Sequence, residues 1–133
     1  MSESKGVPED LYYSKDHEWA RVEGDTAFIG ITDYAQKALG AITFVDLPPV
    51  GKSFRQFAEI AAVESSKAAS DIFAPLSGTV EAVNRALDDA PEKINKDPYG
   101  EGWLLKLKGI DTPGLKSLLT SRQYQALLEQ EQK

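Results

Sequence analysis

Short stretches of alternating apolar and polar residues recur along the chain and predict a protein built mainly of β-strands. The first two stretches span residues 17–23 and 26–31. Gly24 and Asp25 lie between them, and a Gly-Asp pair suits the two-residue turn of a β-hairpin, which needs positive φ angles. The fold is therefore expected to begin with this hairpin.

Further strands are expected in the middle of the chain, separated by turns and loops. They lie, in chain order, at residues 41–45, 57–63, 71–74, 79–84 and 103–108. Turns that contain proline or glycine are expected at 47–51 and 75–78, and polar loops at 88–91 and 95–102. Tyr99, in the second loop, is expected to be exposed. This series of short strands suits two small sheets packed as a flattened barrel or sandwich.

Helical signals are confined to one short internal segment and to the C-terminal end. Thr32 can cap a helix over residues 33–39, and Gly40 is placed to end it. In the tail, apolar residues recur at helical spacing, at Leu115, Leu118, Leu119, Tyr124, Leu127 and Leu128. The expected fold class is therefore mainly β, with a short internal helix and C-terminal helices.

The length and composition fit one folded domain. The chain has 133 residues, of which 41% are hydrophobic and 27% are charged. We expect a single domain over residues 1–133, with an N-terminal extension at 1–12 and a C-terminal helical segment at 112–133.

Charge and cysteine content exclude several classes of function. The formal net charge is -6, which disfavours nucleic acid and anionic membranes as partners, and no apolar run approaches the length of a membrane span. Without cysteines the chain has no disulfides and no thiolate metal site, so any redox chemistry needs an attached or bound cofactor. The polar start, Met1 to Gly6, has no targeting character and favours a cytoplasmic location. A mature protein of the mitochondrial matrix would look similar, although the initial methionine speaks against it.

Lys67 has the most informative surroundings in the chain. It lies among serines and alanines between the two central strands, with Glu64 and Asp71 towards either end of the segment. The strand pattern places it at the tip of a hairpin, where small neighbours leave its ammonium open to a modifying enzyme. Acylation would remove its charge and lengthen its arm. We therefore expect Lys67 to be a site of covalent modification, against the alternative of an ordinary solvated lysine.

Other candidate chemistry is better explained by structure. His17 is the one histidine, so no metal cluster is expected. Ser65 or Ser66 could serve as a nucleophile with Asp71 and His17, but a glycine elbow and an oriented base are missing. A serine hydrolase is kept as the alternative from another functional class.

Several separate segments carry motifs in a characteristic order. They are His17-Glu18-Trp19, Gly30 to Gln36, Glu64 to Asp71, Ser77-Gly78, Val83-Asn84 and Asp97 to Trp103. In this order they resemble the H proteins of the glycine cleavage system, which are lipoyl carriers, and the likeness runs from about Tyr13 to Leu128. The resemblance implies a barrel-sandwich hybrid, the flattened β-barrel of lipoyl domains, with lipoic acid in amide linkage to Lys67. Biotin carriers share this architecture but usually flank their lysine with methionines.

The function that the resemblance implies is that of a non-catalytic carrier. The arm would accept the aminomethyl group of glycine from a pyridoxal-phosphate-dependent glycine decarboxylase, the P protein. It would deliver that group to a tetrahydrofolate-dependent aminomethyltransferase, the T protein, and be reoxidised by dihydrolipoamide dehydrogenase, the L protein. Lipoyl- or octanoyl-transferring enzymes would modify the lysine. An H-like protein that acts mainly as a donor of octanoyl or lipoyl groups is the closest alternative.

The same resemblance suggests roles for residues near Lys67. Recognition around the attachment site is expected to involve Glu64, Ser66, Ala68 and Asp71. Glu18 and Asp71 are the expected acids of a cleft that holds the cationic amine of the loaded arm.

Two positions depart from the family pattern. Ser66 stands where valine is frequent, and Phe57 replaces a glycine expected in the turn before the lysine hairpin. Because a bulky residue tolerates positive φ poorly, we expect that turn to differ while the attachment site is retained.

Overall fold

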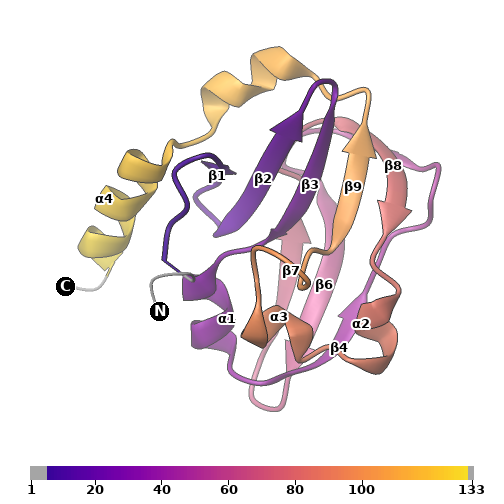
Figure 1. The fold of residues 1–133 in the computed structure, drawn as a ribbon, viewed down its shortest axis with the longest axis vertical. Helices are drawn as coiled ribbons and strands as arrows, with labels where there is room; N and C mark the ends of the chain where they lie inside the picture. The colour runs from indigo at the N-terminus through magenta and orange to yellow at the C-terminus, as the bar shows by residue number, and fades with distance from the viewer. Residues whose placement is uncertain (1–5, 132–133) are drawn as a thin grey trace.

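The computed structural model describes residues 6–131. The first five residues of the expected N-terminal extension and the last two of the C-terminal helical segment lie outside this range. Within it the strands form two antiparallel sheets (Figure 1). The larger sheet contains, in spatial order, β1 Tyr12–Tyr13, β2 Glu18–Glu23, β3 Thr26–Ile31, β9 Leu105–Lys108, β8 Gly78–Val83 and β5 Ser53–Phe54. The smaller sheet contains β4 Ile42–Asp46, β6 Glu59–Ser65 and β7 Ala69–Phe73.

The first hairpin and the internal helix confirm their sequence signals. Gly24 has a φ of 64° in the turn between β2 and β3. The helix α1, Asp33–Leu39, begins after Thr32, whose side chain accepts a hydrogen bond of 3.2 Å from the backbone N–H of Ala35. It ends at Gly40, which has a φ of 84°. Local capping and turn chemistry therefore determines this part of the fold.

The C-terminal segment contains two helical elements of different kinds. The first, Thr112–Ser117, is a 3₁₀-helix that contains Pro113 and Gly114, two residues that disfavour an α-helix. The second is the α-helix α4, Ser121–Glu131. Figure 1 shows both elements running past the β1 side of the larger sheet. The expectation of two C-terminal helices is thus correct in number within the described residues, but the first is not an α-helix.

Four short elements were not expected. They are β1, β5 and two helices, α2 Ala86–Asp89 and α3 Lys93–Lys96. The strands have two residues each and the helices four, so none is long enough to produce a hydrophobic period. The helices occupy parts of the region expected to be loop, and β1 begins within the expected N-terminal extension.

The main core lies between the two sheets. It is formed by side chains from both, including Ile29, Val63, Val80, Leu105 and Leu107, each with 0% of its surface exposed. Burial of aliphatic side chains on both inner faces is what holds the sheets together. These buried side chains hold in place the strands that lead to the lysine hairpin.

A second apolar cluster joins the two ends of the chain. Tyr13 and Tyr124 stack with ring centroids 4.7 Å apart, and Trp19 lies fully buried beside them. Tyr99 also belongs to this cluster with 7% exposure, so the expectation that it is exposed is wrong. Its hydroxyl accepts a hydrogen bond from the backbone N–H of Asp33, which satisfies the polar end of the ring inside the protein.

The turn before the lysine hairpin is unusual because it contains Phe57. This residue has a φ of 70°, the left-handed conformation for which glycine was expected. Its backbone N–H donates a hydrogen bond of 2.6 Å to the carbonyl of Ala74, and its ring is half-exposed. A side chain in this conformation costs about 1–2 kcal/mol, which the surrounding strand pairing must offset.

Candidate functional site

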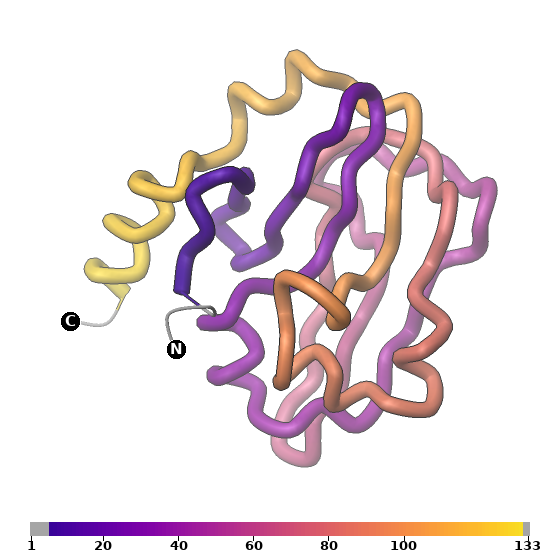
Figure 2. The backbone as a smooth tube through the Cα atoms, viewed as in Figure 1, coloured from indigo at the N-terminus to yellow at the C-terminus, as the bar shows by residue number. Residues whose placement is uncertain are grey.

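The central feature of the candidate site is the hairpin that joins β6 to β7. Its tip is closed by a hydrogen bond of 2.7 Å from the backbone N–H of Ser65 to the carbonyl of Ala68. Ser66 and Lys67 are therefore the two residues of the turn. The tube in Figure 2 shows this hairpin projecting at the lower end of the molecule, beside the chain that leads from α1 to β4.

The side chain of Ser65 holds the tip in shape. Its hydroxyl oxygen accepts hydrogen bonds from the backbone N–H groups of Lys67, at 3.3 Å, and Ala68, at 3.1 Å. A serine hydroxyl that bonds the backbone two and three residues later is a common way to stabilise a tight turn. The position that could have been read as a nucleophile thus has a structural role.

Replacement of Ser65 by alanine is expected to lower the free energy of unfolding by about 0.5–1 kcal/mol, because these bonds are partly solvated. Ser66→Ala provides the control, since Ser66 is exposed and makes no side-chain hydrogen bond with the described residues. Urea unfolding of both variants measures the difference. Equal losses would contradict the role of Ser65 in the turn.

Lys67 itself is exposed, as are Ser66 and Ala68 beside it. Its ammonium forms no ion pair within the described residues 6–131. The amine is thus not covered by an ion pair with the described residues, and no large neighbour obstructs it. This is the accessibility that an acyl-transferring enzyme requires.

The two acids of the hairpin lie on the outward face of the smaller sheet. Glu64 pairs with Phe44 of β4 and Ala69 of β7, and Asp71 lies one outward position further along β7. Both carboxylates are exposed. An enzyme that approaches Lys67 over this face would meet both of them.

Glu18, the other expected cleft acid, is buried. Only 1% of its surface is exposed. One carboxylate oxygen accepts a hydrogen bond from the hydroxyl of Ser14, and the other accepts one of 2.9 Å from the backbone N–H of Phe73. Ser14 was not a candidate, although its spacing of four residues from Glu18 is a local signal. Glu18 therefore binds the free edge of β7 two residues from Asp71, so the structure brings the two expected cleft acids to the same strand.

Burial raises the pKa of Glu18 to about 7, although its hydrogen bonds from Ser14 and Phe73 act in the opposite direction. Desolvation disfavours the charged carboxylate, and the negative charge of Asp16 acts in the same direction. The pKa of Glu18 is therefore raised into the neutral range.

The residues proposed for a serine hydrolase are not assembled. His17 contacts the hydroxyl of Tyr124 at 2.8 Å through Nδ1 and the carboxylate of Glu131 at 3.2 Å through Nε2. No hydrogen bond joins it to Ser65, Ser66 or Asp71 within the described residues. The described residues therefore give the hydrolase alternative no hydrogen-bonded triad.

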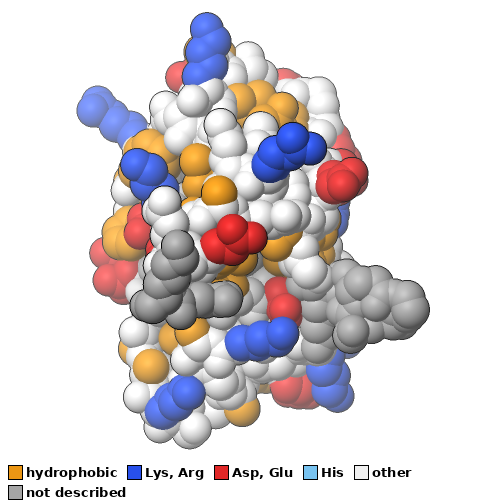
Figure 3. Space-filling view, turned by 90° about the vertical axis from the view of Figure 1, so that its left-hand side faces the viewer, with side chains coloured by type: hydrophobic (Ala, Val, Ile, Leu, Met, Phe, Trp, Pro, Cys, Tyr) orange, Lys and Arg blue, Asp and Glu red, His pale blue; other side chains and the backbone are white. Residues whose placement is uncertain are grey.

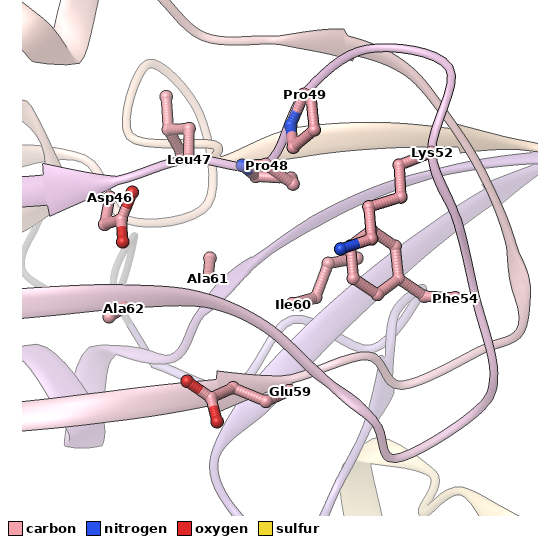
Figure 4. Close-up of a pocket in the computed structure, with 10 residues that line it drawn as sticks. All are labelled: Asp46, Leu47, Pro48, Pro49, Lys52, Phe54, Glu59, Ile60, Ala61 and Ala62. Carbon is pink, nitrogen blue, oxygen red and sulfur yellow. The ribbon is translucent and has the colours of Figure 1, made fainter.

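The surface offers a groove away from the lysine. A cavity of about 300 Å³ opens between the chain after β4 and the start of β6 (Figure 4). Its lining includes Asp46, Glu59 and Lys52, and the ammonium of Lys52 lies 5.1 Å from the ring centroid of Phe54. Lys67 is not part of its lining, so this groove is not a continuation of the hairpin tip.

Two further features bear on partners. On the face that carries α4, basic side chains are scattered among acidic and apolar ones and form no stripe on its described part (Figure 3). In the described residues, no group of three or more histidine, cysteine, aspartate or glutamate side chains could hold a metal ion. Likewise, none of the described helices has the length and apolar character needed to cross a membrane.

Comparison with known proteins gives a consistent result. The glycine cleavage H-protein family matches residues 11–131. The glycine cleavage system H protein of a Thermus thermophilus strain is 51% identical over 125 residues, which cover 94% of this chain and 98% of that protein. The H protein of Photorhabdus laumondii is 53% identical over 127 residues, which cover 95% of this chain and 98% of that protein.

A solved structure extends this likeness to the fold. The crystal structure of a glycine cleavage system H protein from Mycobacterium marinum matches with a TM-score of 0.81 and 38% sequence identity, covering 90% of this chain and 97% of that one. The barrel-sandwich fold expected from the sequence is thereby confirmed. The chain belongs to the glycine cleavage H-protein family, whose members are known as lipoyl-bearing proteins, and is a non-catalytic carrier subunit of the glycine cleavage system.

Proposed function

We propose that Lys67 carries a lipoyl group in amide linkage and that the chain shuttles the aminomethyl group of glycine between enzymes. In this proposal the P protein, a pyridoxal-phosphate-dependent glycine decarboxylase, loads the arm. The T protein, a tetrahydrofolate-dependent aminomethyltransferase, unloads it, and the L protein, dihydrolipoamide dehydrogenase, restores the oxidised arm. The observation that carries the proposal is the exposed, unpaired amine of Lys67 at the tip of a hairpin whose turn is tied by Ser65.

The residues present fit the lipoyl group. An amide bond needs an accessible amine, and Ser66 and Ala68 leave the amine of Lys67 accessible. When attached, a lipoyl group supplies the disulfide and dithiol chemistry that a chain without cysteines cannot provide. The rigid hairpin raises the local concentration of whatever it carries at the active site of each docked enzyme. The matched relatives named above come from bacteria, which supports a cytoplasmic location for the shuttle.

Recognition by the lipoyl- or octanoyl-transferring enzymes is proposed to use four residues of the hairpin. Ser66 and Ala68 provide small neighbours on either side of the lysine, and Glu64 and Asp71 provide exposed negative charge on the outward face. The charges would orient a positively charged partner surface, and the small residues would admit its active site.

The acids of the possible arm cleft remain Glu18 and Asp71. Asp71 offers an exposed carboxylate that forms no ion pair with the described residues. Glu18 offers a buried carboxylate at the edge of the same strand, bound to Phe73. Together they could retain a cationic amine beside β7.

Conversion of both acids to amides is expected to speed release of the aminomethyl group by up to about fivefold, the effect of losing one partly exposed ionic contact. Asp46→Asn is the matched control, because Asp46 lies in the same transverse row of the sheet as Asp71, on the opposite strand. Release is followed by the ammonia that forms with the T protein and tetrahydrofolate. An unchanged rate in the double variant would remove these two residues from the proposal.

The direct test of the function is the mass of the protein after expression with a source of lipoate. A single added lipoyl mass is expected, and digestion should locate it on the peptide that contains Lys67. The modified protein should then support glycine-dependent exchange of carbon dioxide with the P protein. An acylated protein that supports no exchange but passes octanoyl or lipoyl groups to other carriers would favour the donor alternative. Absence of any acyl group would contradict both.

A further inference from the structure

The chain that leads into β4 lies beside the tip of the lysine hairpin. Ile42 of β4 is paired with Ser65 of β6 in antiparallel orientation. Gly40 lies two residues before Ile42, and Lys67 lies two residues after Ser65. The strand pairing therefore brings Gly40 near the tip that carries Lys67.

The side chain of Lys67 fills the space that a side chain at residue 40 would occupy. A Cβ atom built on Gly40 would lie 3.2 Å from Cε of Lys67, 3.9 Å from its Cδ and 3.8 Å from its Nζ. The first distance is shorter than ordinary van der Waals contact, so a methyl group there would displace the end of the lysine. The bare Cα of Gly40 thus forms a seat for the methylene stem of Lys67.

The seat is held by a side chain from another element. The amide nitrogen of Asn95, in α3, donates a hydrogen bond of 2.9 Å to the carbonyl of Gly40, and its amide oxygen accepts one of 2.9 Å from the N–H of Ile42. Asn95 also donates to the side chain of Gln36 in α1 at 2.8 Å. The backbone on both sides of Gly40 is therefore tied to α1 and α3.

We propose that Gly40 is a positioning residue for Lys67, and that residues 40–42, held by Asn95, restrict the directions that the stem of the lysine and its amine can take. This inference rests on the proposed function, because the aligned amine is the one proposed to be acylated. A long side chain loses several rotamers when an enzyme binds it, and partial ordering beforehand reduces that loss. Acylation removes the positive charge of the amine. The seat can then hold the methylene stem of the acylated lysine by van der Waals packing alone.

The contact can be observed without any modification. In the isotopically labelled, unmodified chain, a nuclear Overhauser effect is expected between an α-proton of Gly40 and the ε-protons of Lys67. Its absence would show that the stem does not rest on Gly40 and would overturn the proposal.

The effect on acylation is tested with Gly40→Ala, using Gly51→Ala as the matched control. Gly51 also has a positive φ, 95° against 84° for Gly40, but a Cβ built there meets nothing within 4 Å. Both variants therefore carry an alanine in a conformation that favours glycine, and only one of them disturbs Lys67. With a lipoate ligase, lipoate and ATP, Gly40→Ala is expected to acquire the lipoyl mass about twofold to tenfold more slowly than Gly51→Ala, the range for ordering one long side chain.

The outcomes separate the inference from the function on which it rests. Equal rates for the two variants, with a normally acylated wild-type chain, would overturn the role of Gly40 and leave the carrier function intact. Failure of the wild-type chain itself to accept a lipoyl group would remove the carrier function and, with it, this role for Gly40. A selective loss in Gly40→Ala that accompanies weakening of the nuclear Overhauser effect would support the proposal.

Discussion

Replacement of Lys67 by arginine is expected to abolish lipoyl attachment and to reduce glycine-dependent transfer to the background without carrier. Arginine keeps the positive charge and much of the length of lysine, but its guanidinium stays protonated and does not form the amide. Because Lys67 is exposed and forms no ion pair with the described residues, the free energy of unfolding should stay within about 0.5 kcal/mol of the wild-type value. Intact mass, glycine-dependent exchange of carbon dioxide and urea unfolding measure the three quantities.

Lys108→Arg is the matched control for this loss. Lys108 is also an exposed lysine, but it lies at the end of β9 in the other sheet. It should accept no lipoyl group, and its replacement should leave transfer unchanged. Transfer that persists in Lys67→Arg, or an equal loss of transfer in Lys108→Arg, would contradict the proposal that the lipoyl group is attached at Lys67.

The lysine hairpin could be predicted because its signals are local. Strand patterns on either side and small residues at the tip define the turn within a few positions, and the pairing of Ser65 with Ala68 follows from them. The first hairpin and α1 were predictable for the same reason, since Gly24 and Thr32 act on their immediate neighbours. Motif order added the family, and with it the packing of the two sheets.

The surroundings of the lysine could not be predicted, because they depend on contacts between distant parts of the chain. Asn95 bonds to Gly40 across 55 positions, and it lies in a four-residue helix where only a polar loop was expected. Tyr99 lies among proline, glycine and aspartate, which suggested exposure. Its ring is buried because it packs near Trp19 at a centroid distance of 6.1 Å, and its hydroxyl finds partners in the backbone of other elements.

Glu18 illustrates the same limit in chemical terms. Its place in the matched motif His17-Glu18-Trp19 made it a candidate acid, but it did not indicate its burial or its bond to Phe73, which lies 55 positions away. In the fold this acid is buried and accepts a hydrogen bond from the edge of β7. Its stability contribution therefore depends on whether it is charged.

Glu18→Gln is expected to remove a large part of the pH dependence of stability between about pH 4.5 and pH 7. The folded protein holds a proton on Glu18 up to a pKa of about 7, whereas the unfolded chain releases it near the ordinary value of 4.5. The folded state therefore binds more protons in this interval. The stabilisation is complete below pH 4.5 and is lost as the pH rises through 7. A pKa difference of this size corresponds to about 3 kcal/mol.

Glutamine can replace the neutral acid without leaving its partners unsatisfied. Its oxygen can accept from the N–H of Phe73, and its nitrogen can donate to the hydroxyl of Ser14. At pH 8 the variant should therefore be more stable than the wild-type protein by up to about 3 kcal/mol, and near pH 5 the two should be almost equal. Urea unfolding at a series of pH values measures this difference, with Glu64→Gln as the control for loss of an exposed acid. If the free energy of unfolding of the wild-type protein and of Glu18→Gln changed with pH in parallel, the folded protein would not raise the pKa of Glu18, and the prediction would be wrong.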